Sequence, residues 1–173
     1  MRRVAEKAYT LLKTQGMDHP PINPSDIAKN LGIKIERAAF SDDLSGVLMR
    51  SDGSAIIALN KSHHKVRQRF TIAHELGHFV LNHKGDMFID QKVLNKRDGR
   101  SSIAIDPQEI EANAFAASLL MPEEMLLAEV VKLVPDQTTD RRELIGLLAK
   151  TFDVSIQAIE FRLINLGLIS AEV

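Results

Sequence analysis

The amino-acid sequence predicts an α+β fold, in which a small antiparallel or mixed sheet lies beside a buried central helix. Two observations predict this class: alternating strand patterns between residues 33 and 60, and helical patterns from residue 62 onward. A chain of 173 residues can also bury one sizeable core. We therefore expect a first domain over residues 1–135 and a helical, helix-turn-helix-like subdomain over residues 136–173, packed on the first.

The N-terminal part of the chain predicts two helices followed by strands. Residues 2–15 form an amphipathic helical pattern, and a shorter helix is expected from Ser25 to Asn30. The strands are expected at residues 33–36, 45–50 and 54–60. The turn at residues 51–53 predicts a hairpin between the last two strands, because its Asp-Gly pair supplies the positive φ that a tight turn needs.

A long helix is expected from about Ser62 to His83. Its apolar residues occur on nearly every side, which is typical of a helix at the centre of a fold. Residues 84–106 are polar and mixed, and they predict a mobile loop. The next helix begins at Asp106-Pro107, a favourable N-cap followed by a proline in the first turn. Glu109 is expected to reach back to that N-terminus, and further helices follow as far as Leu166.

The segment His74-Glu75-Leu76-Gly77-His78 has the pattern H-E-x-x-H. On a helix, the two histidines lie one turn apart on one face, where they can fill two of the four tetrahedral positions around zinc. Glu75 lies roughly 100° around the helix from His74. From there it can take a proton from a water molecule at the metal without binding the metal itself. The motif therefore predicts a zinc peptidase with Glu75 as its general base.

A catalytic zinc site needs a third protein ligand. The chain has no cysteine, and neither residue of the metzincin extension follows the motif, so a carboxylate from a later segment is expected. Glu109 and Glu111 both lie in an alanine-rich helix that could approach another helix closely. They point to nearly opposite faces, so only one can be the ligand. Because Glu109 is expected to cap its helix, Glu111 is the preferred third ligand.

The segments 69–78 and 111–122 resemble the two core motifs of the ImmA/IrrE family of zinc metallo-endopeptidases. The order of the motifs, the strands before the first and the helical tail after the second also fit, so the resemblance spans most of the chain. It implies a zincin-like first domain, zinc ligands His74, His78 and Glu111, and Glu75 as the catalytic base. It also implies cleavage of helix-turn-helix repressors in bacteria and mobile elements, which relieves repression of transcription.

Two further positions near the motifs have competing interpretations. In related glutamate zincins, an Asp four residues after the ligand Glu often orients the first histidine, but that position here is Phe115. We expect Asn113 or a backbone carbonyl to take this role. His83 lies off the ligand face and is interpreted as a histidine at a helix C-terminus, where the macrodipole favours it. Stabilisation of an oxyanion is the alternative role for His83.

Composition and charge argue against several other functions. The formal net charge is −1, and residues 141–173 carry four basic and four acidic side chains, so direct binding of nucleic acid is not expected. The helix-turn-helix-like tail is instead expected to pack against protein. The N-terminus lacks an apolar signal core and no apolar run is long enough to span a bilayer, which predicts a cytoplasmic protein without a membrane partner.

The sequence thus predicts hydrolysis of a peptide bond in a specific protein, with a helix-turn-helix repressor as the expected partner. We expect the substrate to pair with an exposed sheet edge among residues 45–60. The alternative is a non-catalytic, zinc-containing regulatory or antitoxin-like binding module. Glu75 distinguishes the two, because a closed structural zinc site needs no base. Zinc is the expected metal, although two histidines and a glutamate also accept manganese or iron.

Overall fold

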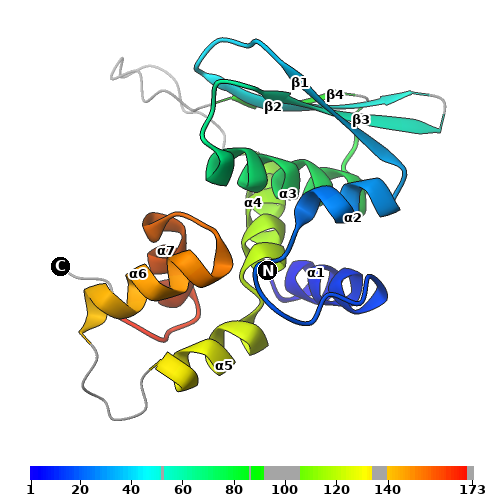
Figure 1. Ribbon diagram of the computed structural model, residues 1–173. Helices are drawn as coiled ribbons and strands as arrows, with labels where there is room; N and C mark the ends of the chain where they lie inside the picture. The colour runs from blue at the N-terminus through cyan, green and yellow to red at the C-terminus, as the bar shows by residue number, and fades with distance from the viewer. Residues whose placement is uncertain (52, 86, 92–105, 134–139, 171–173) are drawn as a thin grey trace.

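The computed structural model describes residues 1–51, 53–85, 87–91, 106–133 and 140–170, with residues 89–91 described by their backbone. A four-stranded sheet covers one side of a central helix, α3, and most of the other helices lie on the opposite side (Figure 1). The predicted α+β class is therefore confirmed. The elements in chain order are α1 (Arg2–Thr14), α2 (Pro24–Asn30), β1 (Ile33–Ala38), β2 (Leu44–Ser51), β3 (Ser54–Asn60), α3 (Lys65–Leu81), β4 (Met87–Gln91), α4 (Pro107–Leu120), α5 (Glu123–Leu133), α6 (Arg141–Phe152) and α7 (Ile156–Asn165).

The sheet is mixed and has the strand order β1-β3-β2-β4. β1 runs parallel to β3, whereas β2 is antiparallel to both β3 and β4. The predicted hairpin between β2 and β3 is confirmed, with Ser51 paired to Ser54 across the turn. Gly53 in this turn has a φ of 81°, a conformation that glycine adopts without strain.

Two expectations about the sheet are wrong. Residues 87–91, within the segment expected to be a loop, form β4, while residues 92–105 of that segment lie outside the described residues. The exposed edge expected among residues 45–60 is not there, because β2 and β3 each have a neighbour on both sides; the edges of the described sheet are β1 and β4. Edge strands commonly carry polar residues, so the polar composition of this segment does not distinguish an edge strand from a loop.

The central helix is enclosed as its sequence predicts. All residues from Thr71 to His78 are buried, with the sheet on one side and α4 on the other (Figure 1). The helix begins after the N-cap His64 and ends at Leu81, so it is shorter at each end than expected. Asn82 follows in the left-handed conformation, with a φ of 55°.

Helices α3 and α4 approach each other closely at Gly77. A Cβ atom at this position would lie 3.0 Å from the Cα of Ala112, 3.1 Å from its carbonyl oxygen and 3.2 Å from the Cβ of Phe115. Glycine on α3 and alanine on α4 together permit this approach. The contact brings the first turns of α4 beside the second half of α3, which carries the H-E-x-x-H motif.

Replacing Gly77 with alanine is expected to lower the free energy of unfolding by about 1–3 kcal/mol, because the added methyl group meets backbone atoms of α4. Gly146 in α6 is a matched control, since no atom lies within 4 Å of a Cβ built there. Gly146→Ala is expected to raise the same free energy by about 0.5–1 kcal/mol. Urea unfolding followed by circular dichroism compares the two variants. A stabilisation of similar size in both would contradict the close contact.

The C-terminal helices share the core of the rest of the chain. Residues of α6 and α7, including Phe152 and Ile159, belong to the same buried cluster as those of α1, α3 and α4. Arg69 of α3 donates hydrogen bonds to the carbonyl oxygens of Asp153 and Ile22, at 3.0 and 2.7 Å. The boundary expected at residues 135–136 falls in a segment outside the described ranges.

The basic residue of α7, the second helix of the helix-turn-helix-like pair, contacts protein. Arg162, the only basic residue of α7, donates to the carbonyl oxygen of Met121 at 3.1 Å. This bond holds the C-terminal pair against the end of α4. In the parts of the chain that the structure describes, no helix combines the length and the apolar character that crossing a membrane requires.

Candidate metal centre

His74 and His78 lie one turn apart on the face of α3 that meets α4. Both are almost completely buried, with exposed fractions of 2% and 0%. Their Nε2 atoms are 3.0 Å apart. Two imidazole nitrogens are therefore directed at one point, as the motif predicts.

Glu109, in the first turn of α4, brings its carboxylate to the same point. Its Oε2 lies 3.2 Å from Nε2 of His74, and its Oε1 lies 3.2 Å from Nε2 of His78. The imidazoles of His74 and then of His78, in contact with the carboxylate, hold the pKa of the Glu109 carboxyl far below its ordinary value. The carboxylate is consequently ionised at neutral pH and can offer electron pairs to a cation.

Glu111, the carboxylate preferred from the sequence, lies elsewhere. The structure brings Glu109 to the two histidines and places Glu111 against His83, with Oε2 of Glu111 3.1 Å from Nε2 of His83. The reasoning that capping would occupy Glu109 is wrong. Asp106 caps α4 by accepting a hydrogen bond from the backbone N–H of Gln108 at 2.9 Å, and Glu109 directs its carboxylate at the histidines.

Asn113 lies one turn after Glu109 and orients the first histidine. Its Oδ1 is 3.1 Å from Nδ1 of His74. An amide oxygen accepts hydrogen bonds, so Nδ1 of His74 carries the proton and Nε2 keeps its lone pair. Of the two partners expected for His74, the structure therefore shows Asn113. It stands four residues after Glu109, the spacing at which related glutamate zincins carry an Asp.

The donor atoms fit a divalent metal ion. The closest pairs among the two Nε2 atoms and the Glu109 oxygens are 3.0 and 3.2 Å apart, and one donor atom from each residue lies within 4.8 Å of the others. Ligands at about 2.0–2.1 Å in a tetrahedron are separated by about 3.3–3.4 Å. The lone pairs on Nε2 of His74 and Nε2 of His78 face each other and repel unless a proton or a cation lies between them. His74, His78 and Glu109 can therefore hold a metal ion.

Glu75 lies beside this group and is completely buried, with an exposed fraction of 0%. Its carboxylate reaches β2, where Oε1 is 3.6 Å from the position that a Cβ would take on Gly46. That Cβ would overlap the methyl group of Thr71, so glycine is what allows β2 to pass this close to α3. Ideal helix geometry directs Glu75 roughly 100° around α3 from His74.

A second layer of side chains lies behind His78. Its Nδ1 is 3.0 Å from Nδ1 of His83, whose Nε2 contacts Glu111. Burial lowers the pKa of His78 below its ordinary value, which keeps the imidazole neutral at pH 7. With Nε2 of His78 facing a metal, its Nδ1–H donates to His83, and Nε2–H of His83 donates to Glu111. The series of hydrogen bonds from His78 through His83 to Glu111 thus favours the tautomer of His78 whose Nε2 can bind a metal.

His83 is the site residue that its helical spacing did not reveal. The helix ends before it, and the left-handed Asn82 reverses the chain so that the backbone N–H of His83 donates to the carbonyl oxygen of His78 at 3.1 Å. Arg50 of β2 holds this turn by donating to the carbonyl oxygens of His78 and His83, at 3.1 and 3.0 Å. Asn82 was the feature of the sequence that could have predicted this turn, because asparagine favours the left-handed position just after a helix.

Strand β4 contributes Phe88 to the site. Its ring stacks on the imidazole of His78, with centroids 4.3 Å apart and planes inclined by 28°. Phe88 is itself buried. The ring therefore covers one face of His78 and fixes the plane of the imidazole, a role that the sequence did not show because β4 was not expected.

Replacing His83 with alanine is expected to weaken zinc binding by about 10–100-fold, because His78 loses the partner that selects its tautomer. Competition with a chromophoric chelator measures the dissociation constant. His19→Ala provides a matched control, since His19 is exposed and outside the metal-binding group. Equal zinc affinity in the two variants would show that His83 does not orient His78.

The fold and the donor group together support a metallopeptidase. The chain matches the Peptidase M78 family, described as the IrrE N-terminal-like domain, over residues 28–164. The protein therefore belongs to this family, and the resemblance seen in the two motifs is confirmed. It is also similar to "Uncharacterized immunity region protein 2" of Bacillus phage phi105, with 25% identity over 120 residues that cover 66% of this chain and 71% of the phage protein.

Proposed function

We propose that this protein is a zinc-dependent endopeptidase in which His74, His78 and Glu109 hold the zinc ion. The observation that carries the proposal is the convergence of two Nε2 atoms and a carboxylate beside the buried Glu75. Structural zinc sites are closed by four protein ligands, whereas three protein ligands leave a position for water or substrate. Zinc bound in this group would polarise the scissile carbonyl and lower the pKa of a water molecule.

We assign the general-base role to Glu75. Glu75 directly follows His74 in α3 without belonging to the metal-binding group, and its buried position shields its carboxylate from bulk water. It accepts the proton of the attacking water and later passes that proton to the leaving amine. Asn113 and His83 hold the two imidazoles in place, so that both Nε2 atoms would face a zinc ion bound in the group.

The proposed place for the substrate backbone is the outer edge of β4. Within the described sheet, β4 is bonded to β2 on one side and forms an edge on the other. Its residue Phe88 packs on His78, so an extended peptide added to this edge would pass the metal centre. Addition of a strand to a sheet edge presents the peptide bonds in an extended and regular form.

The proposed substrate is a helix-turn-helix repressor, cleaved in the cytoplasm so that repression is relieved. The two motifs that resemble the repressor-cleaving family support this substrate, and so does the similarity to a protein whose name places it in a phage immunity region. We propose that residues 136–173 form a subdomain that helps to dock the folded repressor. Its exposed large apolar side chains are Leu147, Ile156, Phe161 and Leu168.

A cleavage assay tests the function. The zinc-loaded protein is incubated with a helix-turn-helix repressor encoded beside its own gene, and the products are weighed by mass spectrometry. We expect a cut at one bond, loss of cutting after a chelator removes the zinc, and recovery when zinc is returned. If the zinc-loaded protein cuts neither this repressor nor an unstructured protein such as casein, the peptidase assignment is wrong and the non-catalytic zinc module replaces it.

A further inference from the structure

A cleft of about 380 Å³ opens beside the first half of α3, between the start of β2 and the start of α7. Phe70 and Val66 of α3 form one apolar wall, and Val154 and Ala158 form the other. The walls are half-buried or buried, so the cleft is a recess that a side chain could enter. Neither the metal-binding group nor the general base uses these residues.

The cleft lies on the same face of α3 as the metal centre. Thr71, Phe70 and Arg67 precede His74 by three, four and seven residues, the spacings that return to one face of a helix. At 1.5 Å per residue, Phe70 lies about 6 Å and Arg67 about 10 Å from His74 along the helix axis. An extended peptide covers such distances in about two to three residues.

The edge strand leads from the metal centre to the same cleft. Phe88, which stacks on His78, is opposite Leu48, and Gln91 three residues later is opposite Leu44. The register shifts between Leu44 and Gly46, so Ser45 lies at an irregularity of β2 and lines the cleft. A substrate strand along β4 would therefore carry a side chain from the metal centre to the cleft within about three residues.

The lining of the cleft indicates which side chain it would accept. The cleft has apolar walls at Val66, Phe70, Val154 and Ala158 and polar side chains at Ser45, Thr71, Ser155 and Gln157. Among the described residues that line it, Arg67 alone is charged. Nη2 of Arg67 donates to Oγ of buried Ser45 at 2.6 Å, which fixes the guanidinium at the cleft. A fixed positive charge in a half-buried recess disfavours a lysine or arginine side chain, whereas the apolar walls favour leucine, methionine or phenylalanine.

We propose that this cleft is a specificity pocket for a large apolar side chain of the substrate, two to three residues from the scissile bond. The proposal rests on the proposed peptidase function, since it takes the metal centre as the point of cleavage. It names a class of substrate sequence: an extended segment with a large apolar residue at that position and no basic residue there.

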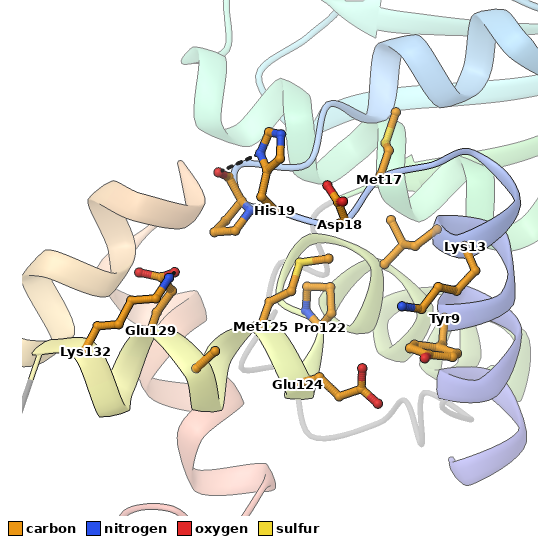
Figure 2. A pocket seen from close by; sticks show the side chains of 13 residues that line it. Tyr9, Lys13, Met17, Asp18, His19, Pro122, Glu124, Met125, Glu129 and Lys132 are labelled. Carbon is orange, nitrogen blue, oxygen red and sulfur yellow. Dashed lines mark hydrogen bonds and ion pairs between the residues drawn. The ribbon is translucent and has the colours of Figure 1, made fainter.

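A second cleft supplies the control. It measures about 250 Å³ and is lined by α1, the segment after α1, and α5. Figure 2 shows Tyr9 and Lys13 of α1 facing Met125 and Glu129 of α5 across it. No residue of α3 or of β2 lines it, so it shares nothing with the metal-binding face. Ala128 in this cleft matches Ala158 in the proposed pocket, because both are helical alanines that line a recess.

The test measures binding, so that it does not depend on cleavage. The probes are two series of tripeptide hydroxamates. In one series the peptide extends from the zinc-binding group on the amino side, and in the other on the carboxyl side. Each position in turn carries alanine, leucine, phenylalanine or lysine. Their dissociation constants are measured by calorimetry on the zinc-loaded wild type and on Ala158→Leu, Ala128→Leu and Arg67→Gln. Zinc content is measured for each variant.

At one position, we expect leucine or phenylalanine to bind at least about tenfold more tightly than alanine, and lysine to bind most weakly. Ala158→Leu fills the cleft and should remove the advantage of the large side chains, whereas Ala128→Leu should preserve it. Arg67→Gln should reduce the penalty on lysine. The proposed pocket would be contradicted if all hydroxamates of both series bound the wild type equally. It would also be contradicted if Ala158→Leu and Ala128→Leu changed the dissociation constants in the same way. Retained selectivity without any peptide cleavage would instead support the pocket and contradict the peptidase function.

Discussion

Replacing Glu75 with glutamine is expected to abolish peptide cleavage while leaving the fold and the metal content unchanged. Glutamine has the same shape as glutamate, but it cannot accept the proton of the attacking water, and removal of a general base costs about 10²–10⁴ in kcat. Zinc content is expected to stay the same because Glu75 lies outside the group of His74, His78 and Glu109. Steady-state cleavage of a verified substrate and atomic absorption measure the two quantities.

The stability of Glu75→Gln is part of the same prediction. Glu75 is completely buried, and glutamine fills the same space, so the substitution leaves no cavity. The urea midpoint of the variant is therefore expected to be no lower than that of the wild type. Glu143→Gln, at an exposed position of α6, is a control that should leave both activity and stability unchanged. Turnover by Glu75→Gln within tenfold of the wild type would remove Glu75 as the base.

Glu109→Ala is expected to weaken zinc binding by more than about 100-fold, beyond the range that loss of an outer partner produces. The variant removes a carboxylate whose two oxygens each lie 3.2 Å from a ligand nitrogen. Glu111→Ala removes only the partner of His83, so its effect on the dissociation constant is expected to be about tenfold or less. Competition with a chelator, on protein shown to be folded by circular dichroism, compares the two variants.

The prediction is the order in which three substitutions weaken zinc binding. Glu109→Ala should be the most damaging, His83→Ala intermediate and Glu111→Ala the mildest. Glu109 belongs to the metal-binding group, His83 contacts His78 of that group, and Glu111 contacts only His83 among these residues. A greater loss of zinc in Glu111→Ala than in Glu109→Ala would show that Glu111 is the third ligand, as the sequence analysis predicted. Glu129→Ala, a substitution of the same kind on α5, should leave zinc binding unchanged.

Local sequence signals were sufficient for the parts of the site that lie within one helix. The H-E-x-x-H spacing sets the relative directions of His74, Glu75 and His78, because helix geometry alone determines them. Asp106 and Pro107 likewise marked the start of α4, since capping involves only neighbouring residues. These predictions needed no knowledge of how the helices pack.

The helical periodicity of α4 favours Glu109 as the carboxylate that joins the two histidines. Ala112 and Ala116 are buried on the side of α4 that packs on α3, and Glu109 precedes them by three and seven residues, so it continues their stripe. The prediction of Glu111 depended instead on the capping interaction expected of Glu109. A capping bond contributes only about 1 kcal/mol, whereas the position of a carboxylate between two buried imidazoles follows from how the two helices meet at Gly77.

The class of fold, the central helix and the pair of histidines could all be predicted from the sequence, because they depend on periodicity and on contacts between near neighbours. The contacts of His83 and Phe88 and the identity of the free sheet edge depend instead on how distant segments pack. His83 reaches His78 only because one left-handed residue reverses the chain and Arg50 holds the turn. An edge is a property of the whole sheet: β2 and β3 are internal because β1 and β4, from distant segments, pair on either side of them.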